Sequence, residues 1–468
     1  MWTLLVALGL CVLIVLLFYY FQHKPVVELD ALLPKSMKGH TSPVLVNNGH
    51  NHWIASWQSY DTSPTKGVSP NHQMIVSSGD NGASWTNPNV VCSIPFWNAG
   101  IDPVADLTRI GKSELLMVWP ESEQTTSGLR PSRIKSATST DNGQSWTGFG
   151  WLPLGLMPTN TGEVRSRVIP NQHGGAIALW SQKQEFGDCH YVLGAQWNNS
   201  DRIWTQPFRI ESPPGNDLDG DINADASESG VVVAMWTGHD SQSTGSTGSN
   251  YNVWMSLSRD AGTTWTTGQP FGHRPNPALF SAFPAVKTDQ KGTWAVAFYR
   301  TRVPNGTVSD ICIRISRDDA NSWPETVWIQ ANNKEELFHG FFPVILETDS
   351  NGNWVLVWTN RVQGEMAGQS YYVTSNDNGL KWSNPRELVN FSFASTLEIT
   401  AMQFASSVLP RNPPYGVCAD GVAALSTDRN GTWLLIYGHS EWSRMENRYR
   451  RSLRLLRSMD NGESWKAL

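Results

Sequence analysis

Five arginines fall in loops beside short apolar, strand-like stretches: Arg165, Arg167, Arg300, Arg302 and Arg361. A guanidinium presents a planar fork of N–H donors that fits a carboxylate through two parallel hydrogen bonds. If these loops converge, the five side chains predict a binding site for a polar, anionic ligand. The alternative is that each arginine is an ordinary solvated loop residue.

An acidic cluster offers a second kind of chemistry. Asp217, Asp219 and Asp221 alternate around Gly220, and alternating oxygen ligands around a glycine resemble a calcium-binding loop. The full calcium-loop spacing with its closing Glu is absent, so an acidic loop without metal is the alternative. The cysteines contain no CxxC pair, which argues against a cysteine-based zinc site. We therefore expect no cofactor, with calcium at the acidic cluster as the one open option.

The elements that would position these loops are marked by a repeated phrase, Ser-x-Asp-x-Gly-x-x-Trp. Ser and Asp side chains bond nearby backbone amides, and Gly adopts a positive φ without steric cost, so the phrase predicts a tight turn anchored by a tryptophan. A sixth copy has Ala320 in place of the glycine, and a seventh slot, ending in Trp204, keeps only the spacing. The five full copies end at Trp85, Trp146, Trp265, Trp382 and Trp465.

The spacing of these tryptophans is about 60 residues, a period typical of radially repeated units. Each unit also carries an apolar strand that ends in an aromatic residue, as in Trp53–Trp57 and Trp354–Trp358. Residues two apart share one face of a strand, so these rings are expected in the core. The pattern predicts an all-β fold: a single β-propeller of four-stranded antiparallel blades, with seven blades expected and six as the alternative.

The repeated phrase is similar to the Asp-box, or BNR repeat, of the sialidase superfamily over roughly residues 40–468. That resemblance implies exo-glycoside hydrolysis, with arginines on a sugar carboxylate, an Asp as acid, and a Tyr–Glu nucleophile pair. By loop position the analogues are Tyr299, Glu163 (or Glu121) and Asp102, with the five arginines as substrate-binding residues. The chain departs from the family in two respects, because sialidases have six blades and an Arg-Ile-Pro element that is absent here. A non-catalytic glycan- or protein-binding propeller and a scaffold remain alternatives.

The ends of the chain complete the predicted domain organisation. Residues 1–24 are expected to form an N-terminal signal anchor, because Trp2–Phe21 is uncharged and long enough to span a bilayer as a helix; a cleaved signal peptide is the alternative. Residues 25–468 form the propeller, with 25–36 as its closing strand. Four N-glycosylation sequons suit an extracellular or lumenal propeller, and the net charge of −6 leaves no basic surface for nucleic acid.

Overall fold

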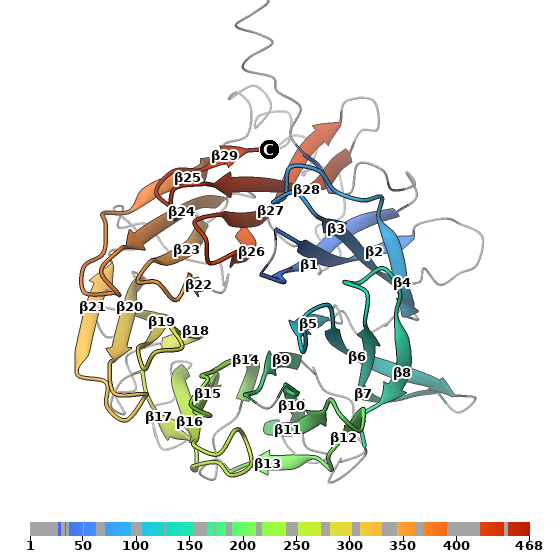
Figure 1. Ribbon diagram of the computed structural model, residues 1–468, viewed down its shortest axis with the longest axis horizontal. Coiled ribbons are helices and arrows are strands. Elements are labelled where there is room, and N and C mark those ends of the chain that lie inside the picture. Colours follow the sequence, from blue (N-terminus) through green and yellow to red (C-terminus); the bar gives the residue numbers. More distant parts are fainter. Residues whose placement is uncertain are drawn as a thin grey trace, which may run out of the picture.

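The computed structural model describes most of the chain from residue 27 onward. The described residues are 27–29, 33, 37–49, 51–61, 71–94, 105–125, 128–153, 166–172, 174–183, 190–211, 218–239, 251–272, 281–301, 309–329, 344–361, 368–390, 422–443 and 448–468. Within them the chain folds into seven antiparallel sheets arranged in a ring around a central opening (Figure 1). The predicted all-β propeller is confirmed, and its blades number seven.

The first three blades take up the chain from Met37 to Ile210. Blade 1 consists of β1 (Met37–Asn47), β2 (Trp53–Asp61), β3 (Asn71–Ser78) and β4 (Asn89–Ile94). Blade 2 consists of β5 (Asp106–Arg109), β6 (Leu115–Thr125), β7 (Gly128–Ser139) and β8 (Thr147–Trp151). Blade 3 consists of β9 (Ser166–Pro170), β10 (Ala176–Lys183), β11 (His190–Asn198) and the outer pieces β12 (Ile203–Trp204) and β13 (Phe208–Ile210).

The other four blades complete the ring. Blade 4 consists of β14 (Leu218–Ala226), β15 (Val232–His239), β16 (Tyr251–Ser258) and β17 (Gln269–Pro270). Blade 5 consists of β18 (Ser281–Thr288), β19 (Trp294–Thr301), β20 (Ser309–Ser316) and β21 (Glu325–Ile329). Blade 6 consists of β22 (Ile345–Thr348), β23 (Trp354–Arg361), β24 (Gly368–Ser375) and β25 (Arg386–Asn390). Blade 7 consists of β26 (Val422–Thr427), β27 (Trp433–Ser443), β28 (Arg448–Ser458) and β29 (Lys466–Ala467).

The predicted aromatic strands are the second strands of the blades, and their rings form the core. Trp53, Trp57, Trp294 and Trp354 are completely buried, and Trp358 is 1% exposed. These rings pack between neighbouring blades, as in the cluster that joins Trp354 and Trp358 of blade 6 to the isoleucines of β20. Since large apolar side chains dominate burial energetics, the contacts between blades stabilise the ring.

The Asp-box turns form as the sequence predicts. In the first, Ser78 Oγ accepts the Gly82 N–H at 2.9 Å, Asp80 accepts the Ser84 N–H at 2.8 Å, and Trp85 Nε1 donates to the Gly82 carbonyl at 3.0 Å. Asn81 and Gly82 both have positive φ, 59° and 78°. Ala320 holds the equivalent conformation with a φ of 62°, so the blade 5 turn survives without its glycine.

The N-terminal segment pairs with the last blade and lies beside the C-terminus. Glu28 forms an antiparallel bridge with Arg454 of β28, and their side chains form an ion pair at 2.9 Å. The Leu29 N–H donates to the Leu453 carbonyl at 3.0 Å, and Val27 donates to the carbonyl of Leu468. The first and last described segments are therefore hydrogen-bonded to each other, which ties the N-terminal segment to blade 7.

Candidate functional site

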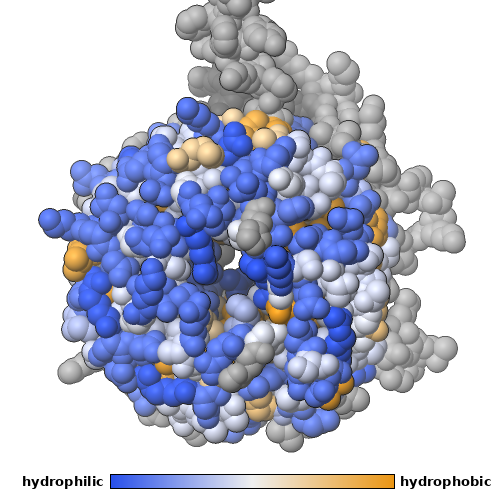
Figure 2. All heavy atoms as spheres, in the orientation of Figure 1, coloured by the Kyte–Doolittle hydropathy of each residue, from blue (hydrophilic) through white to orange (hydrophobic). Residues whose placement is uncertain are grey.

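The channel at the centre of the ring is lined by the innermost strands β1, β5, β9, β14, β18, β22 and β26. It contains a cavity of about 960 Å³, which is large enough for a sugar-sized ligand. Hydrophilic residues surround its opening in the space-filling view (Figure 2). The turns that follow the innermost strands also line this cavity, and these turns lie on the same face as the Asp-boxes. Backbone bonds show it: Asn142 N–H donates to the Ser113 carbonyl, and Asn378 N–H to the Gly352 carbonyl.

Three charged side chains stand at one level of the channel wall, each one residue before the end of its strand. They are Asp225 of β14, Lys287 of β18 and Glu347 of β22. Lys287 Nζ lies 3.1 Å from Glu347 Oε2, and both side chains are less than a quarter exposed. Asp225 accepts the Thr288 N–H at 3.0 Å and that of Ala226 at 3.0 Å. The result is a mostly buried network that spans three consecutive blades.

Burial and charge oppose each other in this network. Burial raises the pKa of the Asp225 carboxyl above its usual value, although the Lys287 ammonium and two backbone N–H groups partly offset the shift. Burial alone lowers the pKa of Lys287, but the carboxylates of Glu347 and Asp225 outweigh it and hold that pKa above its usual value. The ammonium of Lys287 therefore stays charged at neutral pH.

Arg167, the second residue of β9, lines the same channel. Its Nη1 is 3.5 Å from Asp106 Oδ1 of blade 2, while Asp106 Oδ2 accepts the Val168 N–H at 2.7 Å. The guanidinium keeps 32% of its side-chain surface exposed. Its Nε is buried and has no acceptor among the described residues. An unsatisfied buried donor costs about 1–3 kcal/mol. The exposed part of the guanidinium is open to an anionic ligand in the cavity.

Tyr299 and Arg300 lie on β19, the second strand of blade 5, and neither lines the channel cavity. Tyr299 is 1% exposed and packs in the core between blades 5 and 6, where burial raises the pKa of its phenol. Arg300 points to the other face of the strand, and its guanidinium carbon lies 5.2 Å from the ring centroid of Trp328 on the outer strand β21. Of the predicted site residues whose side chains are described, Arg167 alone lines the cavity.

The other predicted residues fall in or beside segments outside the described part. Asp102, Glu163, Arg165, Arg302 and Asp217 all lie outside the described residues. Arg361 is the last residue of β23, and Asp219 and Asp221 belong to β14; only their backbone is described. Within the described part of the chain, no group of three His, Cys, Asp or Glu side chains could hold a metal ion.

Sequence reasoning missed the channel network of Asp225, Lys287 and Glu347. Lys287 and Glu347 each stand two residues before a turn aspartate and seven before the first tryptophan of the next strand. Charged residues in that register break the apolar pattern of the innermost strands, and this is the signal that could have found them.

The predicted anchor Trp2–Phe21 lies outside the described residues, among which there is no helix long and apolar enough to cross a bilayer.

Comparisons with known proteins give structural likeness only. No protein-family model matches the chain, and no curated protein does. Among solved structures, the Hadza microbial sialidase Hz136 aligns with a TM-score of 0.45 at 12% identity over 86% of this chain and 75% of that one. The NanB sialidase of Streptococcus pneumoniae aligns with a TM-score of 0.43 at 11% identity, covering 92% and 93%. The GH93 α-L-arabinofuranosidase of Fusarium graminearum aligns with a TM-score of 0.42 at 11% identity, over 91% of this chain and 95% of that one. Likeness at this level establishes no activity.

Proposed function

We propose that the protein is a sialidase-like propeller that binds the terminal acidic sugar of a glycan in its central channel and hydrolyses its glycosidic bond. The observation that carries the proposal is the guanidinium of Arg167, which lines the channel with 32% of its side-chain surface exposed and, among the described residues, is paired only with Asp106 at 3.5 Å. The choice of a glycan rests on the Asp-box repeat. The choice of an acidic sugar rests on the fit between guanidinium and carboxylate.

The proposed ligand would enter from the channel end opposite the Asp-boxes. Arg165 and Glu163 directly precede β9, and Asp102 precedes β5, so these residues are adjacent in sequence to the strands that carry Arg167 and Asp106. Glycoside hydrolysis generally uses two carboxyl groups that flank the scissile bond. We assign these roles to Asp102 and Glu163. Arg302 and Arg361 follow or end second strands and would act as further anion-binding residues. The buried Tyr299 is given no chemical step.

A non-catalytic glycan-binding propeller is the second candidate, and the channel carboxylates favour it. In the cavity lining, Asp225 accepts two backbone N–H groups, Glu347 is paired with Lys287, and Asp428 accepts two N–H groups of its own turn. Asp106, beside the lining, accepts the Val168 N–H and contacts Arg167. Each of these described carboxylates is therefore held by a structural partner rather than free for proton transfer. Binding without hydrolysis would need only the cationic side chains that line the channel, such as Arg167.

The experiment that separates these functions measures binding and hydrolysis on one panel of ligands. The purified protein is titrated calorimetrically with sialosides, uronic-acid glycosides and neutral glycosides, and sugar release is followed across pH 4–8. Saturable binding with release supports the hydrolase, and binding without release supports the binding propeller. Equal affinity for acidic and neutral sugars, or no binding of any of them, would contradict the proposal.

We also propose that the propeller lies outside the cytoplasm, held by the segment 1–24. The proposal rests on the uncharged run Trp2–Phe21 and on sequons such as Asn198, which is exposed at the end of β11. Expression in a secretory host should give a product that stays in the membrane after alkaline carbonate extraction and loses mass on endoglycosidase treatment. A carbonate-soluble product without glycans would contradict this location.

A further inference from the structure

Three cations stand where the channel cavity opens on the Asp-box face. Arg109 and Lys112 belong to the end of β5 and the turn that follows it, and Arg429 belongs to the turn between β26 and β27. All three line the cavity. Arg429 and Lys112 are exposed, whereas Arg109 is half-buried. We call these three residues the cationic rim.

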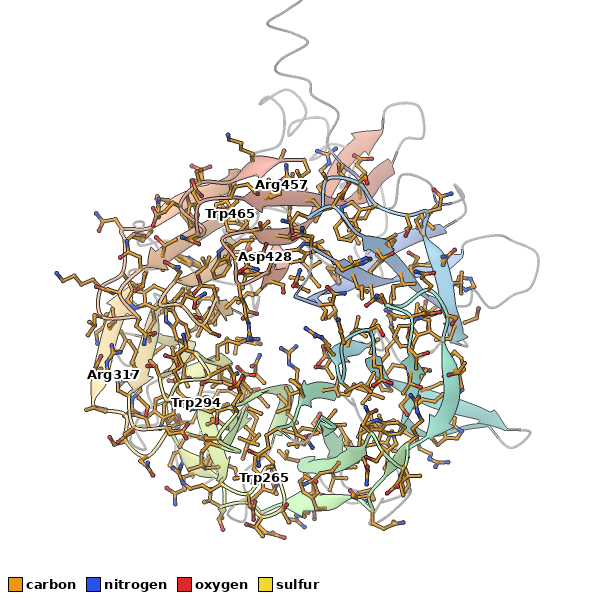
Figure 3. All side chains as sticks on the ribbon, viewed as in Figure 1. Trp265, Trp294, Arg317, Asp428, Arg457 and Trp465 are labelled. Carbon is orange, nitrogen blue, oxygen red and sulfur yellow. The ribbon has the colours of Figure 1, made fainter. Side chains whose placement is uncertain are left out.

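The charges of the rim are not neutralised within the described residues. Arg109 Nε donates to the Gly111 carbonyl at 2.7 Å, and the rim side chains form no ion pair there. Arg317, which lies farther from the channel on the same face, is paired with Glu325 at 2.7 Å. Figure 3 shows Asp428 at the edge of the opening and Arg317 toward the outside of the ring.

The nearest acidic residue of the lining is already engaged. Asp428 Oδ1 accepts the N–H groups of Asn430 at 2.7 Å and Thr432 at 2.9 Å, which fixes the turn that carries Arg429. The Asp428 carboxylate therefore stabilises the turn between β26 and β27 through these backbone hydrogen bonds. Since the chain as a whole carries a net charge of −6, three cations at one mouth that form no ion pair with any described residue are a local exception rather than a general excess.

The two arginines belong to blades 2 and 7, and the turn between β1 and β2 of blade 1 lies between those blades. Asn48 stands in that turn at the register where blades 5, 6 and 7 carry a turn aspartate, so no carboxylate separates Arg109 from Arg429. A Cβ added at Gly49 would lie 3.3 Å from Arg109 Nη1, so the glycine lets the guanidinium lie close over the turn. Burial lowers the pKa of Arg109, and the charge of Arg429 lowers it further, in keeping with their proximity.

We propose that the cationic rim is a second binding site, distinct from the one proposed around Arg167, and that it takes a tetrahedral oxyanion such as a sulfate or phosphate ester. Such a group carries up to two negative charges and several acceptor oxygens, which suits two arginine forks and an ammonium better than a single carboxylate does. A sugar that carries the group and the free anion present the same oxygens to the rim, and the experiment below distinguishes them.

The test is calorimetric titration of the full-length protein with inorganic sulfate, inorganic phosphate and N-acetylglucosamine 6-sulfate at constant ionic strength. The double variant Arg109→Gln/Arg429→Gln should bind each anion at least tenfold more weakly. The matched control is Lys381→Gln/Lys466→Gln, which removes the same charge from two exposed residues that do not line the cavity; it should bind like the unchanged protein. Tighter binding of the sugar sulfate than of sulfate identifies a glycan ligand, and equal binding identifies the free anion.

Two results would overturn the proposal: no saturable binding of any of the three anions, or equal weakening by the two double variants. The second result would mean that net charge, and not the rim, holds the anion. Failure here is distinguishable from failure of the proposed function. The rim variant should keep its affinity for an acidic sugar, and Arg167→Ala should keep its affinity for sulfate.

Discussion

The Asp-box glycines make one sharp prediction about stability, and Gly82→Ala tests it. Gly82 has a φ of 78°, and a Cβ added there would lie 2.6 Å from Leu434 Cδ1 of blade 7. The substitution therefore imposes both a left-handed alanine and a clash between blades 1 and 7. Ala320 shows that the first penalty alone is tolerated, since it occupies the same conformation with φ 62°.

The size of the effect follows from three contributions. A left-handed conformation costs a residue with a Cβ about 1–2 kcal/mol. Crowding Leu434 in a packed interface costs about 1–3 kcal/mol. The substitution also reduces the conformational entropy of the unfolded chain, which offsets the two costs by about 0.4–1 kcal/mol. We therefore expect Gly82→Ala to lower the free energy of unfolding by about 2–4 kcal/mol.

A matched control isolates the clash. Gly174 also has a positive φ, 73°, but a Cβ added there would meet no atom within 4 Å. Gly174→Ala should therefore cost only the strain, about 1 kcal/mol or less. Urea unfolding followed by tryptophan fluorescence measures both. In a Leu434→Ala background, where the clash is gone, Gly82→Ala should cost no more than Gly174→Ala. Equal costs for the two glycine substitutions in the unchanged background would refute the reasoning.

Three further predictions concern the box, the channel and the core. Hydrogen bonds from Ser84 and Ser78 lower the pKa of Asp80 to about 2, below its value of about 3.9 in the unfolded chain. The Asp80 carboxylate therefore contributes its full stabilisation above about pH 3.9 and loses it as the pH falls toward about 2. Asp80→Asn should accordingly flatten the loss of folding stability at acid pH. Lys287→Ala should cost about 2–3 kcal/mol in urea unfolding, because it leaves two carboxylates without their cation. Trp354→Ala should cost about 3–5 kcal/mol, and Trp382→Ala less, because Trp354 is completely buried and Trp382 only partly.

A specific result would contradict each of these three predictions. An unchanged acid limb in Asp80→Asn would mean that the box carboxylate is not stabilised by its hydrogen bonds. A Lys287→Ala variant as stable as the unchanged protein would mean that the channel carboxylates are neutral without it. A larger loss in Trp382→Ala than in Trp354→Ala would place the main core at the turns and not between the blades.

The fold was predictable because its signals are local. The Asp-box turn depends on contacts within eight residues, and the second strands show their aromatic spacing directly, so both could be recognised without knowing the ring. The seven-fold count followed from the spacing of the tryptophans. The left-handed residue before each glycine, such as Asn81, was missed, although asparagine is the residue that favours this conformation after glycine.

The site was harder to predict because the channel wall depends on which strand is innermost and on its register. Tyr299 and Arg300 are adjacent in sequence, but adjacent residues of a strand point to opposite faces, and β19 is a second strand. Neither therefore lines the channel cavity. Arg167 lies on the innermost strand β9 in a register that faces the channel. The charges of Asp225, Lys287 and Glu347 become neighbours only when the ring brings three distant segments together.

The most direct test of the central claim compares Arg167→Ala with Arg300→Ala. Both remove one guanidinium, but only Arg167 lines the channel, whereas Arg300 stacks on Trp328 at the outer strand. Affinity for an acidic sugar is measured calorimetrically, with circular dichroism to confirm that each variant is folded. We predict at least tenfold weaker binding for Arg167→Ala and unchanged binding for Arg300→Ala. Unchanged affinity in folded Arg167→Ala would contradict the account.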